Sequence, residues 1–180
     1  CTTAFRSDKL TKSNVVATAL FGDGAAAAVL TGDAQDGAVC IDAGCEHTWP
    51  DTLDIMGWKV DPIGFEVVFD RAIPPFARRH LKPAVDGFMQ RFGILASEVA
   101  RLSFHPGGTK VLQAIESAFR LQTGALDIER DVLRDFGNMS APTALFVLER
   151  ALSQGMRGVS LLTALGPGFT ASSVPVRVLQ

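Results

Sequence analysis

One long stretch of the chain carries its apolar side chains at helical spacing. Between residues 74 and 92 these side chains recur every four positions, at Phe76, His80, Ala84, Phe88 and Phe92. The cationic Arg78, Arg79 and Lys82 fall largely on the opposite face. This pattern predicts an amphipathic helix with a solvated cationic face and with His80 on its inner edge. Pro83 is expected to kink or split the helix, because proline lacks the backbone N–H.

The remaining elements are predicted from shorter apolar patterns and from turn residues. Apolar runs and alternation predict strands at residues 25–31, 38–49, 54–60, 65–69, 99–104, 158–164 and 174–179. Helical spacing predicts helices at 15–21, 111–121, 128–136 and 143–152, the first capped by Asn14. This order predicts an α/β protein with a mixed β-sheet covered by helices. No repeat or linker interrupts it, so residues 1–180 are expected to form a single domain.

Composition and charge exclude several classes of protein. The chain has 180 residues, of which 47% are hydrophobic and 20% charged, so it can bury a core and is not expected to be disordered. A net charge of −2 gives no attraction to nucleic acid or to an anionic membrane. No apolar run reaches the roughly 18 residues of a membrane span, and none is expected.

The cysteines indicate a reducing compartment and no metal site. An odd set of three, Cys1, Cys40 and Cys45, cannot form a closed set of disulfides, which suits the cytoplasm. Cys40 and Cys45, with His47 nearby, resemble a ligand cluster, but an odd spacing on one strand places the two thiols on opposite faces. We therefore expect no metal. Because the chain begins with Cys1 rather than Met, we expect it to be a piece of a longer protein.

The first candidate for chemistry is His105, in the sequence His105-Pro106-Gly107-Gly108. It follows directly on a predicted strand and precedes a predicted helix, where open α/β sheets place ligands. The two glycines allow a close backbone approach, and the dipole of the helix points toward the same space. A histidine that merely completes a turn remains the alternative.

The second candidate is Asn138, which follows the helix-ending Gly137 and precedes a helix led by Pro142. An amide held between two helices can aim its NH2 group into a cleft, although an asparagine that only caps a helix is the commoner case. On adjacent loops, His105 and Asn138 would form an oxyanion hole with two donors. Phe21-Gly22-Asp23-Gly24 is not a phosphate-binding loop, since no lysine follows, and is interpreted as a structural turn.

Four motifs together resemble the type III polyketide synthases, the chalcone synthase-like enzymes of the thiolase fold. They are Leu20-Phe21-Gly22-Asp23-Gly24-Ala25-Ala26-Ala27, His105-Pro106-Gly107-Gly108, Gly137-Asn138-Met139-Ser140 and Gly166-Pro167-Gly168-Phe169-Thr170. The resemblance spans almost the whole chain and corresponds to the C-terminal half of such an enzyme. It implies one half of a thiolase-like fold, in a protein that is a homodimer when intact.

The resemblance also implies an activity and roles for individual residues. Family members condense malonyl-CoA onto an acyl-CoA starter with a Cys–His–Asn triad, taking coenzyme A thioesters as substrates and using no other cofactor. By motif, His105 and Asn138 are the catalytic histidine and asparagine. Phe5 resembles a gatekeeper of the cavity, with one residue deleted between it and Phe21. Ser140 resembles a cavity-shaping residue, and Gly166, Pro167, Gly168 and Phe169 resemble the scaffold loop of the active site.

The resemblance leaves the nucleophile outside this chain, since the family's catalytic cysteine lies in the N-terminal half. We therefore expect the chain alone to be inactive. Residues 49–58 and 64–69 resemble the bacterial alkylresorcinol and alkylpyrone branch, which implies fatty acyl starters. Two alternatives remain open: a ketoacyl synthase III-like enzyme of fatty-acid initiation, whose histidine is typically followed by Gln-Ala-Asn, and a non-catalytic acyl-CoA-binding module.

Overall fold

A mixed β-sheet forms the centre of the protein. The computed structural model describes residues 6–32 and 38–179, and within them a five-stranded sheet has the order β1-β7-β6-β5, with β2 also paired to β7. Its strands are β1 (Val39–Ile41), β2 (Cys45–Thr48), β5 (Val99–Phe104), β6 (Gly158–Gly166) and β7 (Thr170–Val178). Only β5 and β6 run parallel, and the other pairs are antiparallel. The mixed sheet expected from the sequence is therefore confirmed.

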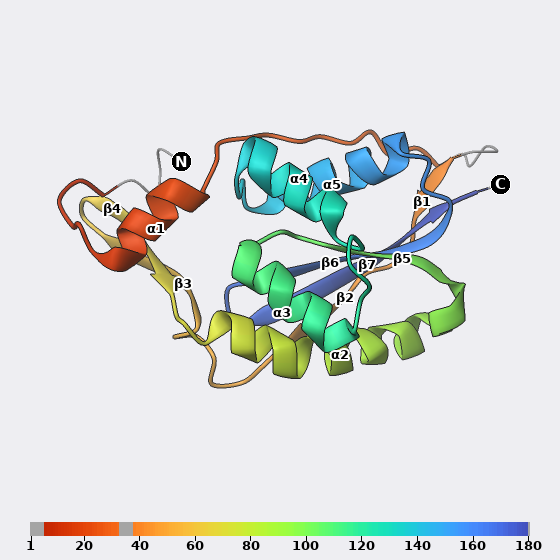
Figure 1. The fold of residues 1–180 in the computed structure, drawn as a ribbon, viewed down its shortest axis with the longest axis horizontal. Helices are drawn as coiled ribbons and strands as arrows, with labels where there is room; N and C mark the ends of the chain where they lie inside the picture. The colour runs from red at the N-terminus through yellow and green to blue at the C-terminus, as the bar shows by residue number, and fades with distance from the viewer. Residues whose placement is uncertain (1–5, 33–37, 180) are drawn as a thin grey trace.

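Helices cover both faces of this sheet. The helices α4 (Asp127–Phe136) and α5 (Ala141–Ser153) lie on one side, and α2 (Ile73–Phe92) and α3 (Thr109–Phe119) on the other (Figure 1). The larger buried cluster joins α2 and α3 to the sheet through residues such as Leu81, Leu112 and Leu161. A smaller cluster packs α4 against α5. A short 3-10 turn, Ala96–Glu98, leads from α2 into β5.

A smaller group of elements lies beside the main sheet. The helix α1 (Lys12–Leu20) packs against the antiparallel hairpin of β3 (Met56–Asp61) and β4 (Gly64–Phe69), at the left of Figure 1. The hairpin agrees with the strand pair predicted at 54–60 and 65–69. No helix in the described ranges is both long and apolar enough to cross a membrane.

The structure differs from the predicted local structure at three places. The first helix is capped by Thr11, whose hydroxyl accepts from the Asn14 N–H, while Asn14 is buried within the helix and its amide donates to the Lys9 carbonyl. Of the two outcomes expected at Pro83, a kink or a split, the split does not occur: α2 runs unbroken over 20 residues, and its buried side chains share a core cluster with those of α3. Residues 38–49 form two strands rather than one, with different stretches of β7 paired to each.

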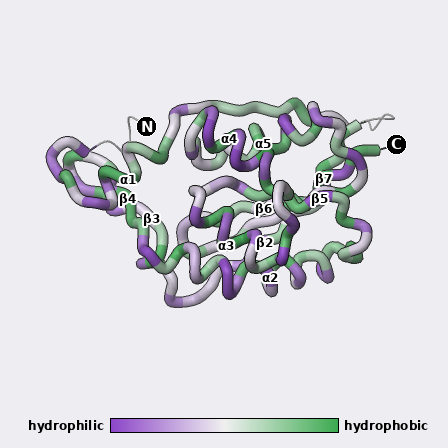
Figure 2. Tube along the Cα trace, viewed as in Figure 1, coloured by the Kyte–Doolittle hydropathy of each residue, from purple (hydrophilic) through white to green (hydrophobic). Residues whose placement is uncertain are grey.

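The strand predicted at 25–31 is absent. The segment belongs to no helix or strand, and its residues are exposed. It crosses the top of the molecule as an extended trace, coloured green for its apolar residues (Figures 1 and 2). A strand requires a neighbour to pair its N–H and C=O groups, and no strand in the described ranges pairs with this segment. Hydrophobicity alone therefore predicted a strand where the fold provides no neighbouring strand among the described residues.

We expect this segment to make the isolated chain self-associate. Val29 is 93% exposed and Leu30 is 74% exposed, and neighbouring apolar side chains exposed to this extent favour association. Replacing both by lysine is expected to lower the sedimentation coefficient at high concentration without lowering the melting temperature. Leu53→Lys, at a side chain 78% exposed in another part of the surface, is the control and should change association less. A wild-type chain that stays monomeric at every concentration would contradict this prediction.

Candidate active site

His105 lies where β5 ends and α3 begins. Its N–H donates to the Thr163 carbonyl at 2.8 Å, which continues the pairing of β5 with β6 by one residue. The Gly107 N–H then donates to the His105 carbonyl at 3.0 Å, closing the turn. The turn ends at Gly108, the residue that precedes α3. The histidine is thus fixed at a sheet edge beside a helix N-terminus, as the sequence predicted.

Asn138 is held at both ends of its amide. Its side chain is almost fully buried, Nδ2 donates to the Gly107 carbonyl at 3.2 Å, and Oδ1 accepts from the Ser140 N–H at 2.8 Å. Because one partner is an acceptor and the other a donor, this network fixes the orientation of the amide. The contact with Gly107 joins the Asn138 loop directly to the His105 turn. The structure therefore brings the two predicted catalytic residues together.

The segment after α1 holds Asn138 in place, a role that the sequence did not reveal. The Asn138 N–H donates to the Leu20 carbonyl, and the Gly22 N–H donates to the Asn138 carbonyl, both at 2.9 Å. A Cβ on Gly22 would lie 2.0 Å from the Phe136 carbonyl oxygen, and one on Gly24 would lie 2.2 Å from the Met139 sulfur. Position 22 therefore requires glycine, whereas a side chain at residue 24 would displace the Met139 side chain. The predicted structural turn serves to position Asn138.

A pocket of about 870 Å³ opens where the hairpin and α1 meet the main sheet. His105 and Asn138 both line it, as do Gly107 and Gly108 at the start of α3. Apolar residues of α1, β3, β4, β6 and the β6–β7 turn also line it, namely Leu20, Met56, Phe69, Leu165 and Phe169. Three cations at its lining were not singled out from the sequence: Lys12, Arg71 and Lys110. Of these, Lys110 could have been found from the sequence, because it lies two residues after the glycine pair, in the first turn of α3.

The turn between β6 and β7 contributes one of its four predicted residues to this pocket. Phe169 lines the pocket, whereas Gly166, Pro167 and Gly168 form the turn behind it. Gly168 has φ +128°, and a Cβ there would lie 2.8 Å from the Thr170 hydroxyl, so glycine is required. The Gly168–Phe169 peptide bond is cis.

Other predicted residues lie elsewhere. Ser140 is exposed and is absent from the pocket lining of the described chain, where its contribution is the N–H bound to Asn138. Phe5 and Cys1 lie outside the described residues. Cys40 and Cys45 are partly buried in β1 and β2 and do not line the pocket. Among the described residues, no group of three His, Cys, Asp or Glu side chains is arranged to hold a metal.

Glu129 supports β5 just before His105, a role that could not be predicted from the sequence. β5 is the edge strand, so the N–H of Phe104 lacks a strand partner and donates instead to Glu129 Oε1 at 3.1 Å. Glu129 Oε2 pairs with Arg101 at 2.6 Å. The carboxylate is fully buried, and this burial raises its pKa against the opposing effect of Arg101. In the sequence of an amphipathic helix, a buried glutamate such as Glu129 cannot be distinguished from an exposed one.

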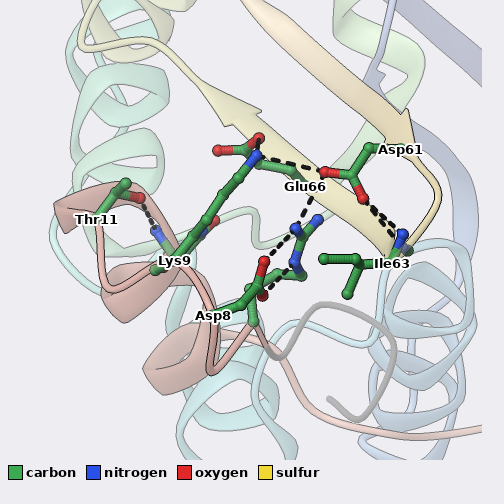
Figure 3. A network of polar contacts seen from close by, with 9 residues as sticks. Asp8, Lys9, Thr11, Asp61, Ile63 and Glu66 are labelled. Atoms are coloured by element: carbon green, nitrogen blue, oxygen red, sulfur yellow. Dashed lines mark hydrogen bonds and ion pairs between the residues drawn. The ribbon is translucent and has the colours of Figure 1, made fainter.

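A polar network anchors the start of the described chain to the hairpin. Arg6 pairs with Asp8 at 2.7 Å and with Asp61 at 3.0 Å, and Lys9 reaches Asp61 and Glu66. Figure 3 shows these carboxylates converging on the two cations from β3, β4 and the residues before α1. The Arg6 guanidinium is the main reason that the pKa of Asp61 falls to about 2. The network thereby fixes one side of the pocket, since α1 and β4 both line it.

Burial lowers the pKa of His105 to about 4, so its imidazole is neutral at neutral pH. A neutral imidazole carries one N–H and can donate one hydrogen bond to a developing oxyanion.

We expect His105 to make the stability of this chain fall in acid. Its pKa in the folded chain lies below the usual value of 6.5, so the unfolded chain takes up the proton first as pH falls. Stability should decrease between about pH 6.5 and pH 4 and level off below. The check is urea unfolding across this range, in which His105→Gln should flatten the dependence. The NMR signal of the His105 imidazole is identified by its absence in His105→Gln. If that signal titrates near pH 6.5 in the wild type, the prediction is contradicted.

Comparisons with known proteins identify the family of this chain. Residues 41–180 match the family described as chalcone and stilbene synthases, C-terminal domain. The chain belongs to this family. It is 40% identical over 174 residues to a 1,3,6,8-tetrahydroxynaphthalene synthase of Streptomyces peucetius, covering 92% of this chain and 46% of that protein. It is 34% identical over 182 residues to a putative chalcone synthase of Bacillus subtilis, covering 95% and 50%.

Among solved structures, the 1,3,6,8-tetrahydroxynaphthalene synthase of Streptomyces coelicolor superposes with a TM-score of 0.88 at 26% identity. The match covers 98% of this chain and 51% of that one. The resemblance to the C-terminal half of a type III polyketide synthase is thus confirmed, as is one half of a thiolase-like fold. The chain spans about half the length of the curated relatives it matches.

Proposed function

We propose that this chain supplies the oxyanion site of a type III polyketide synthase. In the proposed reaction, malonyl-CoA loses carbon dioxide to give an enolate. The enolate carbon attacks the carbonyl of an acyl group held as a thioester, the C–S bond breaks to release the thiolate, and the acyl group is extended by two carbons. The observation that carries the proposal is that His105 and Asn138 line one pocket in a chain of this family. Their donors would hold the thioester oxygen on which the enolate charge develops.

The two residues suit this task in different ways. Asn138 Nδ2 has two hydrogens, one directed to the Gly107 carbonyl, so the other can be donated to substrate. The lowered pKa of His105 keeps its imidazole neutral, so it would stabilise the enolate by hydrogen bonding without first protonating it. Preorganised donors of this kind lower the barrier because they need no rearrangement as charge develops.

The nucleophile is proposed to come from outside this chain. Neither Cys40 nor Cys45 lines the pocket. We therefore propose that the chain alone does not complete a condensation. From the family resemblance, we also propose that the intact protein is a cytoplasmic homodimer with a cysteine in its N-terminal half. Sedimentation of the intact protein tests the dimer.

The pocket is compatible with coenzyme A thioesters as substrates, with no further cofactor. Its wall is mainly apolar, which suits an acyl chain, and Lys12, Arg71 and Lys110 give it positive charge, which suits the phosphates of coenzyme A.

For the starter, we propose a fatty acyl group that leads to alkylpyrones or alkylresorcinols, on the resemblance of residues 49–58 and 64–69 to that bacterial branch. A second candidate product is a tetrahydroxynaphthalene, which is favoured by the 40% identity to the Streptomyces peucetius enzyme. The starter, the number of extensions and the mode of cyclisation decide between them.

The test is product analysis of the intact protein with malonyl-CoA alone and with a panel of acyl-CoA starters. Alkylpyrones or alkylresorcinols formed only with fatty acyl-CoA would support the first candidate. A naphthalene formed from malonyl-CoA alone would support the second. Binding of acyl-CoA without carbon dioxide release or product would instead indicate a non-catalytic acyl-CoA-binding module.

A further inference from the structure

The hydroxyl of Thr52 binds the backbone of the turn that carries Phe169. The Phe169 N–H donates to Thr52 Oγ1 at 2.6 Å, across 117 residues of sequence. The same oxygen lies 2.9 Å from the Gly168 carbonyl oxygen and 2.7 Å from that of Trp49. Because a hydroxyl has one hydrogen, it accepts from Phe169 and donates to one of these carbonyls. Thr52 thus acts as a link between two turns.

The other polar group of the Phe169 backbone is bound by the same segment. Its carbonyl accepts from the Trp49 N–H at 3.0 Å. Phe169 is fully buried and Thr52 is 7% exposed, so bulk water does not replace a partner that is lost. The turn at residues 49–52 therefore determines where the backbone of Phe169 lies.

The aromatic ring of Phe169 is packed from two sides. Trp49 stacks on it with ring centroids 6.0 Å apart, and Phe76 meets it edge to face at 5.3 Å. Phe169 is one of the residues around the pocket that His105 and Asn138 line. A displaced backbone at Phe169 would therefore change the shape of the pocket close to the proposed chemistry.

We propose that Thr52 is a positioning residue that sets the place of Phe169 in the pocket wall and thereby the length of the polyketide product. This proposal rests on the proposed function. A growing chain fills the space that the wall leaves, and closely packed walls respond to shifts of less than 1 Å because they have few voids to absorb them. The hydroxyl of Thr52 matters here because it fixes the one aromatic residue of the β6–β7 turn.

The first part of the experiment requires no catalysis. Trp49 reports on the turn in a Trp58→Phe background, which leaves a single tryptophan. Thr52→Val removes the hydroxyl while keeping the shape of the side chain, and we expect it to change the near-UV circular dichroism and emission of Trp49. Thr52→Ser keeps the hydroxyl and should retain the signal. An unchanged signal in Thr52→Val would overturn the positioning role, whatever reaction the protein catalyses.

The second part measures products of the full-length protein with malonyl-CoA, with and without a saturated fatty acyl-CoA. We expect Thr52→Val to lower kcat/KM by about tenfold, the scale of one lost hydrogen bond, and to shift the ratio of shorter to longer products. Thr52→Ser should restore the ratio. Thr48→Val is the matched control, because the exposed Thr48 bonds only the hydroxyl of Thr170, at 2.8 Å, and should leave the ratio unchanged.

The remaining outcomes also decide the proposal. A changed Trp49 signal with an unchanged product ratio would show that Thr52 positions the turn without controlling length, and would overturn the proposal. A wild-type protein that yields no polyketide would overturn the proposed function, while the Trp49 signal would still report on the turn. Should Thr52→Val fail to fold, Thr52→Ala takes its place. Failure of both while Thr52→Ser folds would assign the hydroxyl to folding as a whole and overturn the proposal.

Discussion

Replacing His105 by alanine in the full-length protein is expected to slow the decarboxylation of malonyl-CoA by about 10²–10³-fold. The imidazole lines the pocket beside Asn138 and carries one N–H for an enolate oxygen. Removing one preorganised donor leaves the developing charge with a single partner, and the pocket cannot reorganise at no cost to replace it. Asn138→Ala is expected to lower the rate of decarboxylation by a similar factor, since it removes the second donor.

The measurement is carbon dioxide release from malonyl-CoA, followed separately from condensation so that the nucleophile does not affect the result. His80→Ala is the control. His80 lies on α2 against Phe76, with ring centroids 4.4 Å apart, and does not line the pocket. Its loss should lower stability modestly and leave decarboxylation nearly unchanged. A folded His105→Ala protein that decarboxylates at the wild-type rate would make the histidine structural and remove the main support for the proposed mechanism.

The sequence predicted the loops at the site better than it predicted what surrounds them. His105 and Asn138 were singled out as candidates because turn residues flank them. Turn chemistry is local: a strand end followed by Pro and two Gly has few backbone solutions. The helices of the second half were found because burial on one face imposes its spacing on the sequence. α2, α3, α4 and α5 each match their predicted range to within a few residues.

What could not be predicted depends on contacts across long stretches of sequence. Residues 25–31 have the composition of a buried strand, but only the fold reveals that no strand in the described ranges pairs with them. Thr52 stands in a turn and resembles any turn threonine until Phe169, 117 residues away, donates to it. Glu129 occupies a helix in which acidic residues are common, and its burial follows from the edge position of β5. Hydrophobic patterning carries no information about such pairs.

Replacing Arg101 by methionine is expected to destabilise the protein by about 3–5 kcal/mol at neutral pH, because it leaves the buried Glu129 carboxylate without its cation. Arg130→Met is the matched control. Arg130 is the next residue on α4 and pairs with Glu116 at a similar 2.7 Å, but both side chains are partly exposed, so a loss below about 1 kcal/mol is expected. Denaturant unfolding of the two variants at pH 7 and 8 measures the difference.

The effect of Arg101→Met should shrink as pH falls. Burial already raises the pKa of Glu129 in the folded protein, and losing the positive charge of Arg101 raises it further. The pKa of Glu129 is then higher in the folded variant than in the unfolded chain. At pH values between these two pKa values the folded protein binds more protons than the unfolded chain, so the variant becomes more stable as pH falls toward the usual glutamate range. Adding Glu129→Gln to Arg101→Met should remove this pH dependence. An Arg101→Met protein whose deficit is the same at pH 5 and pH 8 would contradict the assignment of the loss to an unpaired carboxylate.

The same variant connects the stability of the fold to the site. Glu129 accepts from the Phe104 N–H, and the next residue along the chain is His105. If the loss of Arg101 leaves Glu129 protonated, the carboxyl can still accept a hydrogen bond from the Phe104 N–H. It no longer carries the negative charge that strengthens this bond. We therefore expect folded Arg101→Met protein to decarboxylate malonyl-CoA more slowly than wild type, with a smaller loss than His105→Ala. Decarboxylation by Arg130→Met at the wild-type rate would attribute the loss to the support of β5 rather than to the removal of a surface charge.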